Sequence, residues 1–388
     1  MAGRLVVHIG LGKTGTTTLQ DALDASQEAL ATYGVEVAGG GHRAMRRAVY
    51  DLVGRRIGGG ENTGVDGSFK PFMASIATST APVVVLSEEM LAGARPGQIK
   101  RLVGAVGGRE VIVVVTVRDL ASVLGSYWQQ QIMMGRSQTL PDFLESVRDP
   151  GSGSASAGVG FWVRQDLGRV LAAWETQVPR NNVRIVTVPA DRSESLEDRF
   201  ASVLDVPPGV LRAPEQTNAS VGVPEAELIR RLNLAVAGQL KENHRLQVMR
   251  ALRSGLVGRG SRSIGVPDLP WIHEQTQARI SLLTSRGYQV VGSLDDLTPR
   301  TLPALPEASE SEVADAAIAA LVALTDDHGR LWRRSRRRQQ PGPSQGLGIT
   351  SRGRAATFAL KARALDRADR NRLVAWAART YLKRTSGR

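Results

Sequence analysis

The chain has 388 residues, of which 42% are hydrophobic and 22% are charged, and its formal net charge is +13. These proportions are typical of a folded globular protein, and the absence of cysteine excludes disulfides, a thiolate nucleophile and thiolate-bound metal. The charge is unevenly distributed, because residues 330–388 hold 17 basic and two acidic side chains and leave residues 1–329 with a net charge of −2. A protein that coats nucleic acid with a uniformly basic surface is therefore excluded.

Short apolar runs separated by helical patterns predict alternating strands and helices along residues 4–188. The strands are expected at residues 4–9, 82–86, 111–117 and 182–188, and the helices at 16–33, 120–134 and 161–176. The runs are apolar at nearly every position, which indicates strands covered on both faces in a parallel sheet. We therefore expect an α/β protein with a doubly wound, mainly parallel sheet flanked by helices, and with polar groups gathered at the carboxyl ends of the strands.

Hydropathy and the histidine pattern give no sign of a membrane span, an export signal or a metal site. The longest apolar stretch, residues 111–117, is far shorter than the roughly 20 residues of a membrane span, and the apolar run at the N-terminus breaks at His8. The five histidines are scattered, and none forms a metal-binding pair such as HxxH or HxxxH. We expect a cytoplasmic protein that binds no metal.

Residues 10–18 combine the features of a loop that binds an anion. Glycines at positions 10, 12 and 15 allow a tight turn with inward N–H groups, and the helix that follows presents the positive end of its dipole. A full charge comes from Lys13, and hydroxyl donors come from Thr14, Thr16, Thr17 and Thr18. The loop is not the GxxxxGK[ST] motif of nucleoside triphosphatases, because that pattern requires glycine where Val7 stands.

Residues 8–20, HIGLGKTGTTTLQ, resemble the 5′-phosphosulfate loop of the sulfotransferases that use 3′-phosphoadenosine 5′-phosphosulfate (PAPS). The core of that loop reads P-K-[ST]-G-[ST]-[ST], and here Gly12 replaces the proline. The resemblance implies a P-loop-like sulfotransferase fold and metal-independent transfer from PAPS, with adenosine 3′,5′-bisphosphate as the product. It also implies that the 5′-phosphosulfate is bound by Lys13, Thr14, Gly15, Thr16, Thr17 and Thr18.

A second motif of the same family follows the strand predicted at residues 111–117. In the family, an arginine that ends this strand and a serine eight residues later bind the 3′-phosphate, and this chain has Arg118 and Ser126 at that spacing. A guanidinium can hold phosphate through two parallel hydrogen bonds, and a hydroxyl can close a third side. Asn218 and Ser220 resemble a loop that closes over the nucleotide, while a helix cap explains them equally well. The resemblance covers residues 4–300 and does not include the basic tail.

Transfer to a hydroxyl also needs a group that accepts the hydroxyl proton. Glu89 follows the strand at residues 82–86, at a position where the family has an acidic residue, and is the preferred candidate. His42 lies in a glycine-rich turn and is the second candidate, because an imidazole titrates near neutrality. Four aromatic residues either line a groove for the acceptor or belong to the core: Tyr127, Trp128, Phe161 and Trp162.

The domain prediction separates the body from its basic end. Residues 1–329 are expected to form the sulfotransferase domain, 330–354 a basic linker, and 355–388 a basic amphipathic helical tail. The tail either docks on the body with its charges in water or brings residues 330–388 to an anionic membrane or polyanion, which would make the protein peripheral at the membrane.

The sequence predicts a PAPS-dependent sulfotransferase acting on a hydroxyl of a carbohydrate, lipid or natural product, with no nucleic-acid partner. The alternatives are a Mg-ATP-dependent phosphotransferase and a nucleotide-regulated module that binds membrane or polyanion.

Overall fold

The computed structural model describes residues 3–55, 64–151, 156–191, 194–214, 221–237, 242–258, 264–304 and 307–339. The chain divides into two units, residues 1–327 and 328–388, and the first contains the sheet and the candidate site. The described strands are β1 (Arg4–His8), β2 (Val35–Val37), β3 (Val83–Ser87), β4 (Glu110–Val117), β5 (Val183–Thr187) and β6 (Gln289–Val291).

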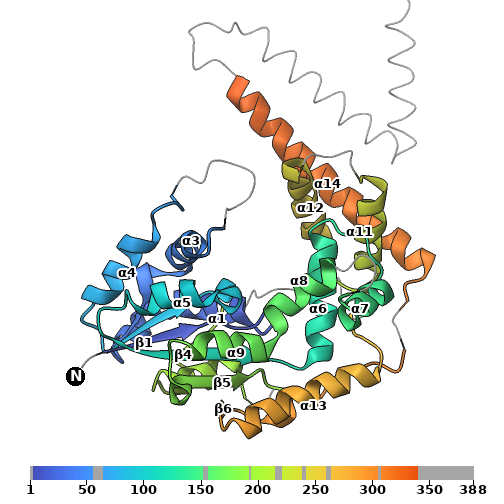
Figure 1. Cartoon of the computed structure of the whole chain (residues 1–388). Helices are drawn as coiled ribbons and strands as arrows, with labels where there is room; N and C mark the ends of the chain where they lie inside the picture. Colours follow the sequence, from blue (N-terminus) through green and yellow to red (C-terminus); the bar gives the residue numbers. More distant parts are fainter. Residues whose placement is uncertain are drawn as a thin grey trace, which may run out of the picture. The chain divides into compact units, whose positions relative to one another are not determined.

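The described helices carry the labels of Figure 1. The α-helices are α1 (Thr16–Ala25), α2 (Gln27–Ala31), α3 (His42–Val53), α4 (Phe69–Thr78), α5 (Pro96–Val103), α6 (Leu120–Met133), α7 (Leu140–Arg148), α8 (Ser156–Gln165), α9 (Leu167–Glu175), α10 (Leu196–Val203), α11 (Val223–Ala235), α12 (Glu242–Leu256), α13 (Pro270–Ser285) and α14 (Glu310–Gln339). The short 3-10 helices are η1 (Ala38–Gly40), η2 (Glu89–Gly93), η3 (Arg180–Asn182) and η4 (Leu294–Leu297).

The strands form one parallel sheet in the order β2-β3-β1-β4-β5-β6, which confirms the α/β class and the parallel pairing expected from the apolar runs. The chain passes from β1 to the β2–β3 side of the sheet and then crosses to β4 on the other side of β1 (Figure 1). Ligands of such sheets bind beyond the carboxyl ends of the strands where the winding changes direction. In this chain, that place lies between β1 and β4.

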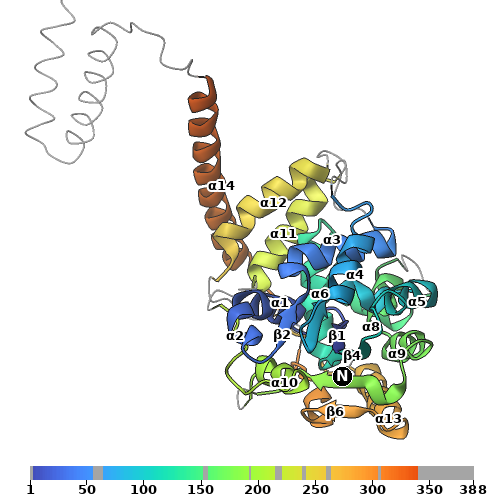
Figure 2. The ribbon, with the colours of Figure 1, turned by 90° about the vertical axis from the view of Figure 1, so that its left-hand side faces the viewer.

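Helices cover both faces of the sheet, which explains the apolar strands. Figure 2 shows α1, α2 and α10 on one side of the strands and α5, α9 and α13 on the other. Every residue of β3 is buried, as is every residue of β4 except the first. Among the described residues, no helix is both long enough and apolar enough to cross a membrane.

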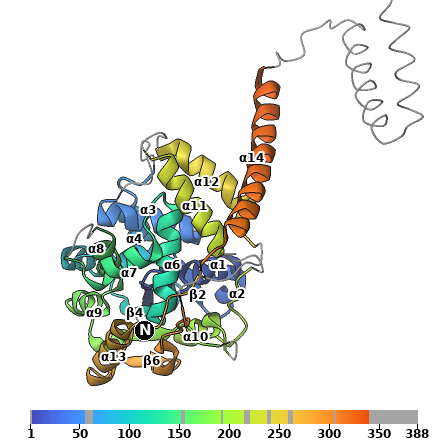
Figure 3. The ribbon, with the colours of Figure 1, turned by 90° about the vertical axis from the view of Figure 1, so that its right-hand side faces the viewer.

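A second hydrophobic core, built mainly from helices, lies beside the sheet layer. Helix α6 contacts α7, α11 and α13, and Figure 3 shows α11 and α12 beside α6. The ring of Tyr127 on α6 is stacked on Phe143 of α7, and Phe161 of α8 meets both rings edge-on. Tyr127 and Phe161, two of the four aromatic residues considered for an acceptor groove, are therefore core residues, whereas the buried Trp128 also lines a pocket of about 360 Å³ between α7 and α11.

The structure differs from the sequence prediction where short elements or side-chain caps decide the boundaries. The helix expected at residues 161–176 is two helices, because the Asp166 carboxylate accepts a hydrogen bond from the backbone N–H of Arg169 at 2.9 Å and starts α9. The helix expected at 16–33 is likewise broken, at Ser26. Strands β2 and β6 were not predicted, and residues 330–339, predicted as linker, are the end of α14.

Candidate active site

The loop between β1 and α1 has the backbone geometry of an anion-binding turn. Lys13 and Gly15 are left-handed, with φ of 70° and 83°, and the intervening Thr14 is not. Alternation of this kind turns successive N–H groups toward one point. Gly15 precedes α1 without a side-chain cap, and a Cβ there would lie 2.4 Å from Leu196 Cδ2. The N–H groups of the first turn of α1 are therefore not taken by a capping side chain.

A network of buried, hydrogen-bonded side chains connects this loop to β1, β3 and β4. His8 contacts the Ser87 hydroxyl through Nδ1 at 2.8 Å and the Thr116 hydroxyl through Nε2 at 3.1 Å. The Thr116 hydroxyl is in turn 2.7 Å from that of Thr14, which donates to the Leu11 carbonyl. Burial lowers the pKa of His8 to about 3, so its imidazole is neutral. His8 is thus a structural residue of the first strand.

Helix α8 holds the loop from the side, through a residue that the sequence did not single out. The buried Gln165 amide donates to the carbonyl of Gly12, at the position where the resembled family has proline. The carbonyl of Gln165 accepts a 2.8 Å hydrogen bond from the buried Arg279 on α13. The loop is thereby connected to two helices far along the chain, which no local motif could indicate.

Arg118 follows the last residue of β4 and brings the second sequence motif next to the first. Its Nη1 donates to the Lys13 carbonyl at 3.5 Å, across 105 residues of sequence. Burial lowers the pKa of Arg118, partly offset by Asp119, whose carboxylate oxygen lies 3.9 Å from Nε. Ser126 lies in the second turn of α6 and is half-buried.

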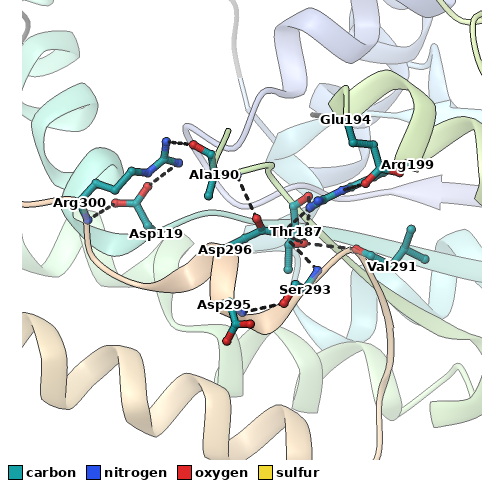
Figure 4. Close-up of polar contacts among 10 residues, drawn as sticks. All are labelled: Asp119, Thr187, Ala190, Glu194, Arg199, Val291, Ser293, Asp295, Asp296 and Arg300. Atoms are coloured by element: carbon teal, nitrogen blue, oxygen red, sulfur yellow. Dashed lines mark hydrogen bonds and ion pairs between the residues drawn. The ribbon is translucent and has the colours of Figure 1, made fainter. Parts of the chain in front are cut away.

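A second arginine, Arg300, lies beside Arg118 and comes from the segment that follows η4. The backbone N–H of Arg300 donates to Asp119 Oδ1 at 3.3 Å, and its Nη2 lies 3.2 Å from Oδ2 (Figure 4). The charge of Arg300 further lowers the pKa of Arg118, and both guanidinium groups lie within 4 Å of the Asp119 carboxylate. Asp119 is fully buried and also caps α6 through a 2.8 Å bond from the Ser122 N–H. The sequence analysis missed Arg300, which lies 181 residues beyond Asp119.

The carboxyl end of β3 carries two glutamates, and the structure distinguishes them. Glu88 is 2% exposed, and its N–H donates to the His8 carbonyl at 3.0 Å. Burial, which outweighs the attraction of Arg46, raises the pKa of Glu88 from 4.5 to about 7. Glu89, the preferred base of the sequence analysis, lies in η2 and is half-buried. Because β1 lies between β3 and β4, Glu88 and Arg118 flank the anion-binding loop on its two sides.

His42 is placed away from the loop. It is the first residue of α3 rather than part of a turn, and its N–H donates to Asp24 Oδ1 at 3.0 Å. Asp24 stands near the end of α1, eight residues and about 12 Å from the helix start at Thr16. Burial and the charge of Arg46 lower the pKa of His42 against the effect of Asp24 and Asp21.

The predicted nucleotide-closing residues, Asn218 and Ser220, lie outside the described residues. The next described residue, Val221, has its carbonyl bound to the Gln129 amide on α6 at 2.6 Å. That helix also carries Ser126. The fourth aromatic residue, Trp162, is half-buried and donates through Nε1 to the Val147 carbonyl at 2.8 Å.

Buried polar atoms without a hydrogen-bond partner gather around this loop. Among the described residues nine such side-chain atoms occur, and five of them belong to residues at or beside the loop: Thr16, Glu88, Arg118, Asp119 and Gln165. Buried polar groups in native proteins are almost always paired with protein or ordered water, so a cluster of this kind marks a place where water or a polar ligand can bind. The donors of Thr16 and Arg118 suit an anion, and the acceptor of Glu88 suits a proton donor such as a hydroxyl.

Comparison with known proteins adds no relative from which a function could be transferred. No family model matches the chain, and a search of curated proteins found no match.

Proposed function

We propose that this chain is a sulfotransferase that moves a sulfuryl group from PAPS to the hydroxyl of an acceptor. The observation that carries the proposal is the contact between the two motifs, in which Arg118 Nη1 reaches the Lys13 carbonyl at 3.5 Å. A donor with one phosphate at each end of its ribose needs two cationic sites side by side. The β1–α1 loop and the end of β4 offer such a pair.

In this proposal, the two cationic sites divide the donor between them. Lys13, with the N–H groups and hydroxyls of residues 14–18, holds the 5′-phosphosulfate. Arg118 and Ser126 hold the 3′-phosphate, and Arg300 adds a third cation to that end because it shares Asp119 with Arg118. Asn218 and Ser220 remain proposed contacts of the nucleotide.

Bound PAPS would supply the sulfuryl group, whose transfer forms a bond to the acceptor oxygen and breaks the bond to the 5′-phosphate oxygen. Glu88 takes the hydroxyl proton, because a buried carboxylate whose pKa is about 7 is ionised in part at neutral pH and is basic enough to accept it. Lys13 and the N–H groups of α1 stabilise the charge that develops on the leaving phosphate oxygen. The proposal therefore moves the base from Glu89 to Glu88 and gives His42 no role in proton transfer.

The phosphotransferase alternative would require Asp119, at the end of β4, to bind Mg²⁺ instead of the two arginines. It needs a strand-end carboxylate that is free to hold Mg²⁺. Oδ1 of Asp119 accepts from the N–H groups of Ser122 and Arg300, and Oδ2, which accepts no hydrogen bond, is ion-paired with the guanidinium groups of Arg300 at 3.2 Å and Arg118 at 3.9 Å. This arrangement favours the use of Asp119 as a support for the two arginines.

Calorimetry with adenosine 3′,5′-bisphosphate and with ATP, each with and without Mg²⁺, tests the nature of the donor. We expect metal-independent binding of the bisphosphate that is weakened about 10- to 100-fold in Arg118→Ala. Binding of ATP that requires Mg²⁺, together with no binding of the bisphosphate, would refute the proposal.

Transfer of labelled sulfuryl groups from PAPS to a hydroxyl-bearing extract tests the enzyme against the binding-module alternative. Lys13→Ala should lower turnover by about 10²- to 10³-fold, and Glu88→Gln by about 10²- to 10⁴-fold. Glu89→Gln is the matched control, since it changes the neighbouring carboxylate in the same way and should keep most of the activity. The reverse ranking of the two glutamate variants would return the base to Glu89, and absence of transfer by the full chain would favour the module.

A further inference from the structure

Helix α3 lies across the carboxyl end of β3, next to the proposed base, Glu88. The sulfur of the buried Met45 on α3 accepts the Ser87 N–H at 3.2 Å. Helix α3 also contacts η2, the turn that follows Glu88. Because β1 lies between β3 and β4, α3 borders the candidate site on the β3 side, whereas Arg118 borders it on the β4 side.

Two exposed arginines reach the turn after β3 from different ends of α3. Arg46, in the first half of the helix, has its Nε 3.8 Å from Glu88 Oε2. Arg55, just beyond the end of the helix, donates through Nη1 to the sulfur of Met90 at 3.1 Å. Gly54 allows the second contact, because its left-handed conformation, with φ of 69°, ends α3 and turns the chain at Arg55. Both guanidinium groups therefore lie at the turn that carries the proposed base.

Neither guanidinium group meets a strong hydrogen-bond acceptor among the described residues. The 3.8 Å ion pair with Glu88 is too long for a hydrogen bond, and Glu88 Oε2 is one of the buried atoms without a hydrogen-bond partner. The thioether sulfur of Met90 is a weak acceptor. Arg180, in contrast, donates to the Glu175 carboxylate at 2.9 Å. Both arginines at the turn can therefore gain a stronger partner from a bound molecule.

Positive charge prevails around this turn. Residues 42–55 contain four arginines and one acidic residue, Asp51, and residues 87–91 add two glutamates. Asp51 Oδ2 is directed to α4, where it accepts the Phe69 N–H at 2.9 Å. The arginines outnumber the carboxylates even when both glutamates are ionised, and a bound anion is therefore attracted to this side of the site.

We propose that the acceptor substrate is a hydroxyl-bearing acid, such as a uronic acid unit of a carbohydrate, whose carboxylate is bound by Arg46 and Arg55. This inference rests on the proposed sulfuryl transfer and names the class of molecule that receives the group. A planar guanidinium donates two parallel hydrogen bonds to a carboxylate, which is the strong partner that both arginines lack within the protein. A carboxylate bound to Arg46 places a neighbouring hydroxyl close to Glu88.

Other classes of acceptor substrate fit this turn less well. A neutral alcohol makes weaker hydrogen bonds to a guanidinium than a carboxylate does. A phosphate monoester suits the arginines, but near neutral pH it brings almost two negative charges close to Glu88 and Glu89. Like charges that face one another across a contact lower the affinity. A single carboxylate uses both guanidinium groups with the least repulsion.

Labelled sulfuryl transfer from PAPS to a hydroxyl-bearing extract tests the acceptor class, when the extract is first divided by anion exchange into neutral and acidic fractions. Part of the acidic fraction is treated so that its carboxylates become neutral amides. We expect the label in the acidic fraction, and at least about tenfold less of it after this treatment, because charge-assisted hydrogen bonds are lost. Label that enters mainly the neutral fraction, or that is unaffected by the treatment, would overturn the inference. So would acceptor activity that is lost after treatment with a phosphatase.

Three variants test the residues. Arg46→Ala and Arg55→Ala should each raise the KM for the acidic fraction about tenfold, and Arg55→Ala should change the KM more than kcat, because it removes substrate binding. Arg47→Ala is the matched control, since Arg47 is an exposed residue of the same helix whose guanidinium lies beside Gly64. It should keep the KM of the natural chain. Equal KM values for all three variants would overturn the inference.

Calorimetry with adenosine 3′,5′-bisphosphate separates this inference from the proposed function. The three variants should bind the bisphosphate as the natural chain does, which also shows that they are folded. A chain that binds the bisphosphate and labels only neutral molecules would refute the acidic acceptor alone. A chain that labels no fraction would refute the proposed transfer as well.

Discussion

Two clusters of polar side chains lie at the carboxyl edge of the same sheet, and they differ in how their polar atoms are paired. Beyond β5 and β6, Arg199 Nη1 donates to the carbonyl and hydroxyl of Thr187 at 2.9 and 2.7 Å and pairs with Asp296 (Figure 4). Asp296 also accepts the Ala190 N–H at 2.9 Å, and Arg199 Nε reaches Glu194 at 2.6 Å. Around the carboxyl ends of β1, β3 and β4, in contrast, five side chains keep a buried polar atom without a hydrogen-bond partner.

This difference in pairing distinguishes polar side chains that stabilise the fold from polar side chains that can bind a ligand, although both groups lie at the same edge of the sheet. At β5–β6, Arg199 is paired with both Glu194 and Asp296, and Asp296 also binds the Ala190 N–H, so this cluster fastens the segment after β6 to the sheet and keeps Arg300 near Asp119. At the ends of β1, β3 and β4, several buried polar atoms make no hydrogen bond within the protein. A ligand that supplies these hydrogen bonds would therefore stabilise that cluster. Changes in the first cluster should therefore act on stability, and changes in the second on binding and proton transfer.

The largest effect is expected from breaking the paired cluster. Asp296→Ala leaves the guanidinium of the buried Arg199 without its main partner and should lower the free energy of unfolding by about 3–5 kcal/mol. Urea unfolding followed by circular dichroism measures the loss. Asp295→Ala is the control, because the neighbouring carboxylate is exposed and should change stability by less than about 0.5 kcal/mol. Equal effects of the two variants would contradict the assigned role of the cluster.

The next effect concerns Glu88 and depends on pH. Its pKa is about 7 in the folded chain against 4.5 when exposed, so the folded state binds the proton more tightly. The stability contributed by this group is present below pH 4.5 and is lost as the pH rises through 7. Glu88→Gln should therefore be more stable than the natural chain at pH 8, by at most about 3 kcal/mol, and equal to it near pH 4.5.

Urea unfolding at pH 5, 6.5 and 8 measures this difference. The pKa of His8 is also displaced, downward to about 3, and its contribution is lost as the pH falls below 6.5. Because His8 is present in both proteins, its effect cancels in the difference between them. Parallel curves for Glu88→Gln and the natural chain would exclude a raised pKa at Glu88.

Arg118 should affect binding more than folding. Arg118→Ala removes charge-assisted hydrogen bonds to the proposed 3′-phosphate and should weaken bisphosphate binding by about 1.5–3 kcal/mol. Its free energy of unfolding should change less, since the contacts of Arg118 within the protein are long, at 3.5 Å from Nη1 to the Lys13 carbonyl and 3.9 Å from Nε to Asp119. Arg286→Ala, which removes an exposed guanidinium paired with Glu175, is the control in calorimetry. A loss of stability without a loss of affinity would place Arg118 with the paired cluster.

The sheet was predictable because its main strands are buried on both faces and their sequence is apolar at nearly every position. Strands β2 and β6 have three residues each, and so short a segment becomes a strand only through pairing with β3 and β5. Helix boundaries at Ser26 and Asp166 depend on single residues inside a continuous apolar pattern. These elements are set by tertiary contacts, which a local pattern does not contain.

The candidate site shows the same division between local and distant signals. Lys13 and Arg118 lie in motifs of neighbouring residues, and the sequence brings out both, although their roles stay predictions. The choice between Glu88 and Glu89 depends on which residue ends β3, and the strand continues one residue further than the apolar run. Arg300 and Gln165 reach the loop region from distant parts of the chain, so no spacing in the sequence points to them.

The smallest effect on ligand binding is expected at Gln165, whose side chain has one polar atom that is hydrogen-bonded within the protein and one that is not. Its amide N–H is used inside the protein, on the Gly12 carbonyl, while its Oε1 has no partner. Gln165→Met keeps the volume and removes the bond, so the loop should be less ordered and bisphosphate binding weaker by about 1 kcal/mol, or about fivefold. Asn233→Leu, which removes two 2.8 Å bonds to backbone carbonyls in the helical core, should lower stability and leave affinity unchanged. If Gln165→Met behaved like Asn233→Leu in calorimetry, Gln165 would belong to the scaffold, and the glycine at position 12 would need no external support to bind an anion.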